Sequence, residues 1–182
     1  MRRFFCLLFL AFATAAPAGG AAAPRFEAFV LGIAQDGGVP HLGCDRDCCT
    51  EARKSGRALS PACLGVRDRK TGALVLFEAT PAIEAQIARF QRLAGVSDRG
   101  RKPVDAVVLT HAHIGHYAGL AQFGREVAAT AQLPVHVSPR MAAFLSGNGP
   151  WSQLVDLGQI ELIPFESGVA FEPIPGLRIT AV

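Results

Sequence analysis

The sequence predicts a mixed α/β fold, and three features carry this prediction. Short apolar segments with strand character recur from residue 26 onward. Between them, a segment that starts at Pro81 repeats apolar residues at the spacing of a helix until Gly95. Residues 104–109 form a continuous apolar run typical of a buried strand. Strand and helix patterns in this alternation favour one half of an α/β sandwich.

The first expected elements lie on either side of a long loop. Residues 26–33 have the pattern of a strand, and residues 35–61 form a loop rich in glycine, cysteine and charge. A hairpin of strands 64–67 and 73–78 follows, with Lys70-Thr71-Gly72 at its turn. Long loops in small domains are usually functional or braced, so we expect one of these roles for the loop.

The segment from Pro81 to Gly95 is expected to be a helix, because proline suits the first helical turn and glycine suits a helix end. Its apolar stripe consists of Ile83, Ile87, Phe90 and Leu93. A stripe at this spacing packs into a hydrophobic core, so we assign it no ligand.

The second half of the chain continues the alternation of strands and helices. We expect a buried strand at 104–109, helices at 120–131 and 140–145, and strands at 134–138, 160–165, 169–171 and 177–182. The sequence contains no internal repeat and no sign of a second domain.

Three of the five histidines lie within six consecutive residues, directly after the buried strand. The segment is Thr110-His111-Ala112-His113-Ile114-Gly115-His116. At a strand end, His111 and His113 project to the same side, and His116 follows after one glycine. Neutral imidazole is a good zinc ligand, and a strand end that leads into a loop leaves an ion open to water. The segment therefore predicts a hydrolytic metal site.

This segment resembles the Thr-His-x-His-x-Asp-His-x-x-Gly signature of the metallo-β-lactamase superfamily, which comprises zinc-dependent hydrolases and related proteins with an αββα sandwich fold. Residues 74–79 resemble the family's hydrophobic strand, which ends in an acidic residue beneath the histidine loop. Residues 30–40 and the cysteines downstream resemble the branch named after the pyrroloquinoline quinone biosynthesis protein B. The resemblance implies the N-terminal portion of the αββα sandwich.

The resemblance implies that His111 and His113 are ligands of a first zinc site and that His116 is a ligand of a second. Gly115 departs from the family pattern, because the family usually has an aspartate there as the other ligand of the second site. Glycine offers no donor atom, so we expect one catalytic zinc ion. By the same reasoning, Gly115→Asp is expected to raise the number toward two.

Two acidic residues are candidates for supporting roles. Without the usual aspartate, proton transfer needs another acceptor, and Asp36 in the glycine-rich loop is the candidate catalytic residue. The alternative is that Asp36 only sets a Gly-Gly turn. Glu78 is expected to accept a hydrogen bond from a ligand histidine or a loop amide and so to orient it.

The resemblance also implies ligands from later strands, namely a further histidine, a bridging aspartate and a last histidine. We therefore expect the chain to be the N-terminal part of a longer reading frame. The alternative is that a partner completes the site. His136, on the alternating segment 134–138, is expected to be a half-buried strand residue and not a ligand.

The cysteines suggest a second metal site. Close-spaced thiolates with a nearby imidazole suit a closed tetrahedral zinc site, here Cys44, Cys48 and Cys49 with His41 as the fourth ligand. The resemblance to the branch also implies a cysteine-bound structural metal near the N-terminus. A disulfide and free thiols are the alternatives. Cys63 is expected to be a small buried apolar residue.

The N-terminus has the features of a secretory signal peptide. A basic start is followed by an apolar run too short for a comfortable membrane span and by small residues. We assign residues 1–23 to the signal peptide, with cleavage between 15 and 23, and residues 24–182 to one metallo-β-lactamase-like domain that is truncated at its C-terminus. The alternative is an uncleaved membrane anchor.

Export predicts a periplasmic or secreted protein with no stable membrane anchor after cleavage. Removing Arg2 and Arg3 takes the net charge from +3 to +1, which argues against a nucleic-acid surface. We expect a zinc-dependent hydrolase that acts on a small-molecule ester, lactone, amide or phosphoester. Zinc would lower the pKa of its water from about 15.7 to about 7 and would polarise the substrate. The alternatives are a non-hydrolytic protein related to pyrroloquinoline quinone biosynthesis or transport, and an inactive fragment.

Overall fold

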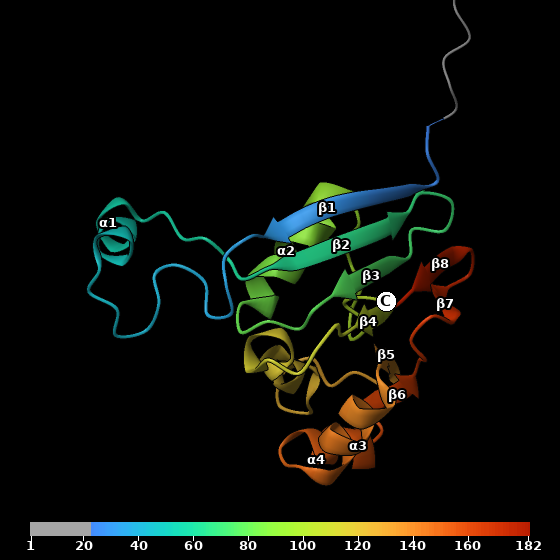
Figure 1. The fold of residues 1–182 in the computed structure, drawn as a ribbon. Helices are drawn as coiled ribbons and strands as arrows, with labels where there is room; N and C mark the ends of the chain where they lie inside the picture. Colours follow the sequence, from blue (N-terminus) through green and yellow to red (C-terminus); the bar gives the residue numbers. More distant parts are fainter. Residues whose placement is uncertain (1–22) are drawn as a thin grey trace, which may run out of the picture.

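A six-stranded sheet forms the frame of the computed structural model, which describes residues 23–182 (Figure 1). Its strands follow one another in chain order: β1 Phe26–Gly32, β2 Cys63–Asp68, β3 Leu74–Phe77, β4 Ala106–Val108, β5 Leu133–Val137 and β6 Ile160–Pro164. Strands β1 to β3 are antiparallel, and β3 to β6 are parallel. A separate antiparallel hairpin consists of β7 Ala170–Ile174 and β8 Leu177–Thr180.

The two faces of the sheet are covered by different elements. The helical elements after β2 are α2 Ile83–Ala94, η1 Ile114–His116, η2 Ala118–Phe123, α3 Pro139–Gly147 and α4 Trp151–Asp156. One face packs with them around a large core that includes Leu31, Phe90 and Phe123. On the other face, a smaller cluster of valines packs against Ile174 of the β7–β8 hairpin. The expected mixed α/β fold, with a hairpin between β2 and β3, is confirmed.

Helix α2 matches the helix expected between Pro81 and Gly95. Ile83 and Phe90 are fully buried, whereas Leu93 is 49% exposed, so the expected stripe was wrong at its last position. The helix ends at Gly95, which has the left-handed conformation (φ 62°) and donates to carbonyls of the last turn. Phe90 packs so closely on Gly65 of β2 that a β-carbon there would lie 2.7 Å from the ring.

Three local expectations are corrected by the structure. The segment 35–61 is not only a loop, because it contains helix α1 Asp47–Ser55. The helix expected at 120–131 is only the short 3₁₀ helix η2, which ends at Phe123. There, the Thr130 hydroxyl donates to the carbonyls of Phe123 and Gln159 and so holds an irregular turn. Helix α4 was not expected from the sequence.

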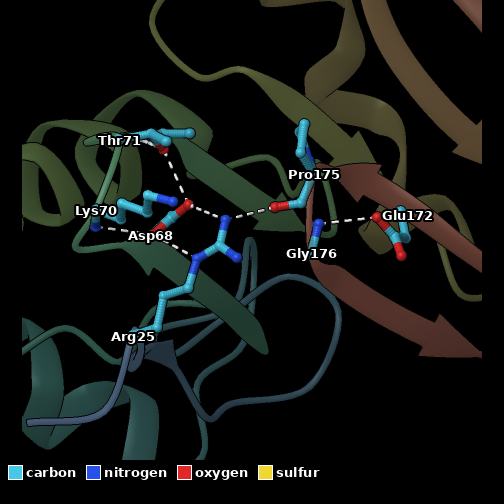
Figure 2. A network of polar contacts seen from close by, with 8 residues as sticks. Arg25, Asp68, Lys70, Thr71, Glu172, Pro175 and Gly176 are labelled. Carbon is cyan, nitrogen blue, oxygen red and sulfur yellow. Dashed lines mark hydrogen bonds and ion pairs between the residues drawn. The ribbon is translucent and has the colours of Figure 1, made fainter. Parts of the chain in front are cut away.

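An ion pair between exposed Arg25 and buried Asp68 joins the β2–β3 turn to the second hairpin. Figure 2 shows the Arg25 guanidinium donating to both oxygens of Asp68, at 3.1 and 2.7 Å, and to the carbonyl of Pro175 at 2.6 Å. Asp68 is 1% exposed and also accepts from the Lys70 amide and the Thr71 hydroxyl. The pair therefore clamps β7–β8 onto the sheet.

The expected signal peptide, residues 1–23, lies outside the described residues except for its last position. Among the helices of residues 23–182, none has the length and apolar character that crossing a membrane requires.

Candidate metal centre

The parallel pairing of β3 and β4 places an acidic residue next to the histidine segment. Phe77 pairs with Val108, and the Glu78 amide donates to the Val108 carbonyl at 3.0 Å. The Glu78 carboxylate therefore lies beside Thr110, whose hydroxyl donates to its Oε1. Glu78 has a positive φ of 75°, and its side chain is 8% exposed. The expected place of this residue, beneath the histidine loop, is the place the structure gives it.

The histidine loop folds back and is hydrogen-bonded to the segment that follows β3. After His113, the 3₁₀ turn η1 brings His116 round, and the Ala79 amide donates to the His116 carbonyl at 2.8 Å. The ring centroids of His111 and His113 lie 4.7 Å apart, and those of His111 and His116 lie 4.1 Å apart. The loop thus gathers the three imidazoles into one cluster, in which His111 and His116 lie near Glu78.

The donor atoms in this cluster have the spacing of metal ligands. His111 Nε2 and His113 Nδ1 lie 3.1 Å apart. Two ligands about 2.1 Å from one ion at a tetrahedral angle are themselves about 3.4 Å apart. Ligand atoms of Glu78, His111 and His116 also lie within 4.8 Å of one another. The cluster can therefore accept an ion from more than one side.

Two buried polar atoms beneath the cluster lack hydrogen-bond partners. Glu78 Oε2 and His116 Nδ1 face each other at 3.5 Å, and neither atom makes a hydrogen bond. Leaving such atoms unsatisfied is costly. Burial raises the pKa of Glu78, although the hydrogen bonds from Thr110 oppose this. A cation bound by the imidazoles would favour the charged carboxylate, so these residues fit a metal ion.

A pocket of about 430 Å³ opens next to His111. Its lining includes Ser138 and Arg140 at the start of α3, with Met141 and Phe144 on the same helix. Ser138 Oγ accepts from the Met141 amide at 3.3 Å and caps the helix. These residues were not predicted from the sequence. A signal was present, because Ser-Pro directly after a strand is a recognisable helix start. Such a helix starts at the edge where parallel strands end, which is where ligands often bind.

Asp36, the candidate catalytic residue, lies at the histidine cluster. Its Oδ1 is 3.4 Å from His116 Nε2, and its side chain is 54% exposed. Gly115 packs directly against this residue, since a β-carbon on Gly115 would lie 2.6 Å from Asp36 Cα. In Gly115→Asp, the new side chain would meet the backbone of the glycine-rich loop, so this loop would have to shift before the variant could add a ligand.

His136 lies in β5, and it is more buried than expected, with 6% exposure. Its ring stacks on Phe171 at a centroid distance of 5.3 Å, and burial lowers its pKa. It does not belong to the group of ligand atoms around Glu78. His136 is therefore a strand residue, as expected.

The cysteine segment is less well assembled. The Sγ atoms of Cys48 and Cys49 lie 4.0 Å apart, and Cys49 Sγ accepts from the His41 amide at 3.4 Å. Within residues 23–182, however, Cys44, Cys48, Cys49 and His41 do not bring three ligand atoms within 4.8 Å of one another. All four cysteines in this part of the chain are unpaired.

Cys63 is 6% exposed in the core, as expected of a small apolar residue. Burial and the nearby Glu78 raise the pKa of its thiol to about 12. A thiol with a raised pKa is a weaker nucleophile and metal ligand than an exposed one.

Comparison with known proteins defines the class of this fold. Residues 74–182 match the family described as the beta-lactamase superfamily domain. The crystal structure of Zn²⁺-bound PqqB from Methylobacterium extorquens superposes with a TM-score of 0.70 at 25% identity, covering 84% of this chain and 54% of that one. A diphosphatase of the PhnP family superposes with a TM-score of 0.60 at 26% identity, covering 85% of this chain and 55% of that one.

Curated sequences point to the same branch. The chain is 30% identical over 160 residues to the coenzyme PQQ synthesis protein B of Methylobacterium sp. (strain 4-46), and 26% identical over 161 residues to that of Methylorubrum extorquens (strain PA1). These matches cover 85% and 83% of this chain, and the chain spans about half the length of each relative. The fold is thus of the metallo-β-lactamase type, and the chain belongs to the beta-lactamase superfamily, with PqqB-like relatives.

Proposed function

We propose that the protein containing this chain is a metal-dependent hydrolase whose metal centre includes His111, His113 and His116. The observation that carries the proposal is the clustering of three imidazoles, of which His111 and His116 lie next to the buried Glu78 carboxylate, while His111 Nε2 and His113 Nδ1 lie 3.1 Å apart. The PqqB crystal structure named above contains zinc, which supports zinc as the ion here. A bound zinc ion supplies a Lewis acid and an acidified water.

The residues around the ion would act as ligands, orient those ligands or accept a proton. His111 and His113 are exposed and can hold an ion that still meets solvent and substrate. Glu78 orients His116 from below, and Thr110 fixes one oxygen of Glu78. Asp36 is exposed beside His116, and its carboxylate can accept a proton.

The pocket beside His111 suits a small substrate with an anionic or polar group. Arg140 and Ser138 offer donors on the side where the substrate would lie, and Met141 and Phe144 offer apolar contact. Esters, lactones, amides and phosphoesters all fit the proposed chemistry. The diphosphatase among the similar structures supports the phosphoester.

A panel of activated substrates tests the proposal. An aryl ester, a lactone, an aryl amide and an aryl phosphodiester are each incubated with metal-loaded protein, with chelator-stripped protein and with the His111→Ala/His113→Ala variant. We expect turnover of at least one substrate class that stripping abolishes and zinc restores. Turnover that survives in the double variant, or no turnover in any class, would contradict the proposal.

A second candidate function is a role in pyrroloquinoline quinone biosynthesis or transport without hydrolysis. The similarity to coenzyme PQQ synthesis protein B across most of this chain supports it. Calorimetric titration with pyrroloquinoline quinone distinguishes the two functions. Saturable binding without turnover of any panel substrate favours the second candidate, and turnover without binding favours the first.

We further propose that the protein is exported and carries a structural zinc at Cys44, Cys48 and Cys49. The basic and apolar start of the sequence supports export to the periplasm or the medium, and the spacing of the cysteines supports the zinc. Mass spectrometry of the secreted form should place its first residue between 15 and 24. An uncleaved N-terminus would contradict the signal peptide.

A further inference from the structure

Gly115 and Asp36 form one packed unit, although they are far apart in the sequence. A β-carbon built on Gly115 would lie 2.6 Å from both Cα and Cβ of Asp36, and 2.8 Å from its carbonyl oxygen. Gly115 is buried, so the two backbones meet without solvent between them. The Asp36 side chain therefore starts almost where a side chain on residue 115 would start.

The carboxylate of Asp36 points back to the histidine cluster. Its Oδ1 lies 3.4 Å from His116 Nε2. This separation is the one expected for two ligands of one tetrahedral ion, about 3.4 Å. A carboxylate and an imidazole nitrogen at this spacing are a suitable pair of zinc ligands.

The two nitrogens of His116 face different carboxylates. Nδ1 lies 3.5 Å from buried Glu78 Oε2, and Nε2 lies 3.4 Å from exposed Asp36 Oδ1. A ligand histidine usually donates its second N–H to a carboxylate, which fixes the tautomer and leaves the other nitrogen free for the metal. Glu78 is placed to receive that proton, so Nε2, on the side of Asp36, is the nitrogen left for an ion.

The turn that carries Asp36 is held in position by the backbone. The Gly38 amide donates to the Gln35 carbonyl at 2.7 Å and closes the turn. On its far side, Val39 and Leu59 exchange two hydrogen bonds of 2.8 Å. Asp36 therefore does not need a long loop movement to reach the cluster.

We propose that Asp36 replaces the aspartate missing at position 115 and, with His116 Nε2, forms a second metal position beside the one formed by His111 and His113. Gly115 is then a steric requirement, because only glycine lets the turn approach. This inference rests on the proposed metal-dependent function, and it replaces the single-ion expectation drawn from Gly115 alone.

Cobalt(II) titration of the chelator-stripped intact protein tests this inference. Thiolate charge-transfer absorption reports any cobalt on the cysteines, so the remaining equivalents belong to the histidine cluster. We expect two such equivalents in the parent and one in Asp36→Asn. Glu161→Gln, a matched change at an exposed acid on β6, should retain two. Elemental analysis of zinc-loaded samples provides the independent count.

A second variant separates the ligand role from a fold defect. Gly115→Ala should push the turn away and lose the same equivalent as Asp36→Asn, while His111 and His113 keep the first. Circular dichroism checks that each variant is folded. Two equally tight equivalents in Asp36→Asn, or only one in the parent, would overturn the inference and leave the proposed function intact. No cobalt at the histidine cluster of the parent would overturn both.

Discussion

The histidine cluster and the cysteine segment are both metal-site candidates in the sequence, but they lie in different parts of the fold. The histidine loop follows a central strand of the sheet and is bonded to the end of β3 through Ala79 and His116. The cysteine segment lies on the excursion between β1 and β2 that carries α1 away from the sheet (Figure 1). Donor atoms converge in the first region and stay apart in the second.

This difference shows how a sheet prepares ligands for an ion. Parallel strands with fixed register place their following residues side by side, so Glu78 and Thr110 meet without any metal. In the cysteine segment, a metal would have to order the thiols itself, at a cost in conformational entropy. The two regions should therefore respond separately to substitution.

Replacing the two strand-end histidines should have the largest effect. In His111→Ala/His113→Ala, the first metal position should be empty, because it loses both its ligands. Elemental analysis on protein that also lacks Cys44, Cys48 and Cys49 measures this loss. With the cysteines intact, any zinc that they hold should remain. Unchanged metal content in the cysteine-free double variant would contradict the assignment.

Gly119→Ala should damage the histidine region selectively. A β-carbon on Gly119 would lie 2.1 Å from the Thr80 carbonyl, so η2 must move away from the segment that also holds His116. Overpacking of this kind costs about 1–3 kcal/mol of the free energy of unfolding. Thermal unfolding should show the loss, and metal titration should show weaker binding at the histidines only. Gly147→Ala, where no atom lies within 4 Å of the new carbon, is the matched control.

Low pH should destabilise the folded protein, because protonation of Asp68 weakens its ion pair with Arg25. The hydrogen bonds from Arg25 hold the pKa of Asp68 far below its usual value, despite burial. A carboxylate with a lowered pKa in the folded state stabilises the protein above its unfolded pKa of about 3.9, and this stability is lost as the pH falls. Asp68→Asn should lower the melting temperature of metal-free protein at pH 7, and the difference from the parent should shrink below about pH 4.

Asp105 should also stabilise the folded protein at neutral pH and lose this contribution in acid. Burial raises its pKa, but hydrogen bonds from the Leu74 amide, Lys102 and Arg99 outweigh burial, so the net pKa is lowered. Asp156→Asn, at an exposed position on α4, is the control for the pH series. A melting-temperature difference between Asp68→Asn and the parent that stays constant from pH 7 to pH 3 would refute the assigned role of the ion pair.

The smallest effect is expected in the cysteine region. Arg53 donates to the carbonyls of Cys44 and His41, at 2.5 and 2.7 Å, and ties α1 to the preceding turn. Arg53→Ala removes two exposed hydrogen bonds, worth about 0.5–1.5 kcal/mol each. Zinc affinity at the cysteines should fall about tenfold, with none of this change at the histidines. Lys54→Ala is the control. An equal fall in zinc affinity in both variants would contradict the role assigned to the Arg53 hydrogen bonds.

Much of the fold was predictable because its signals are local. The apolar run at 104–109, the hairpin turn at Lys70-Thr71-Gly72 and the spacing of Ile83 and Phe90 depend on neighbouring residues alone. The pairing of His111 with His113 is local too, since alternate residues at a strand end share a side. Where local signals compete with long-range bonds, the prediction failed, as at Thr130 beside Gln159.

The sequence by itself determined the α/β class, the order of the strands along the chain and the three histidines that gather at one strand end. Only the tertiary structure decided that Asp36 lies against Gly115, that Glu78 faces one nitrogen of His116, and that the cysteines do not converge within the described residues. The physical reason is distance along the chain. A contact between a loop before β2 and a turn after β4 depends on how several strands pair, and no local pattern encodes that pairing.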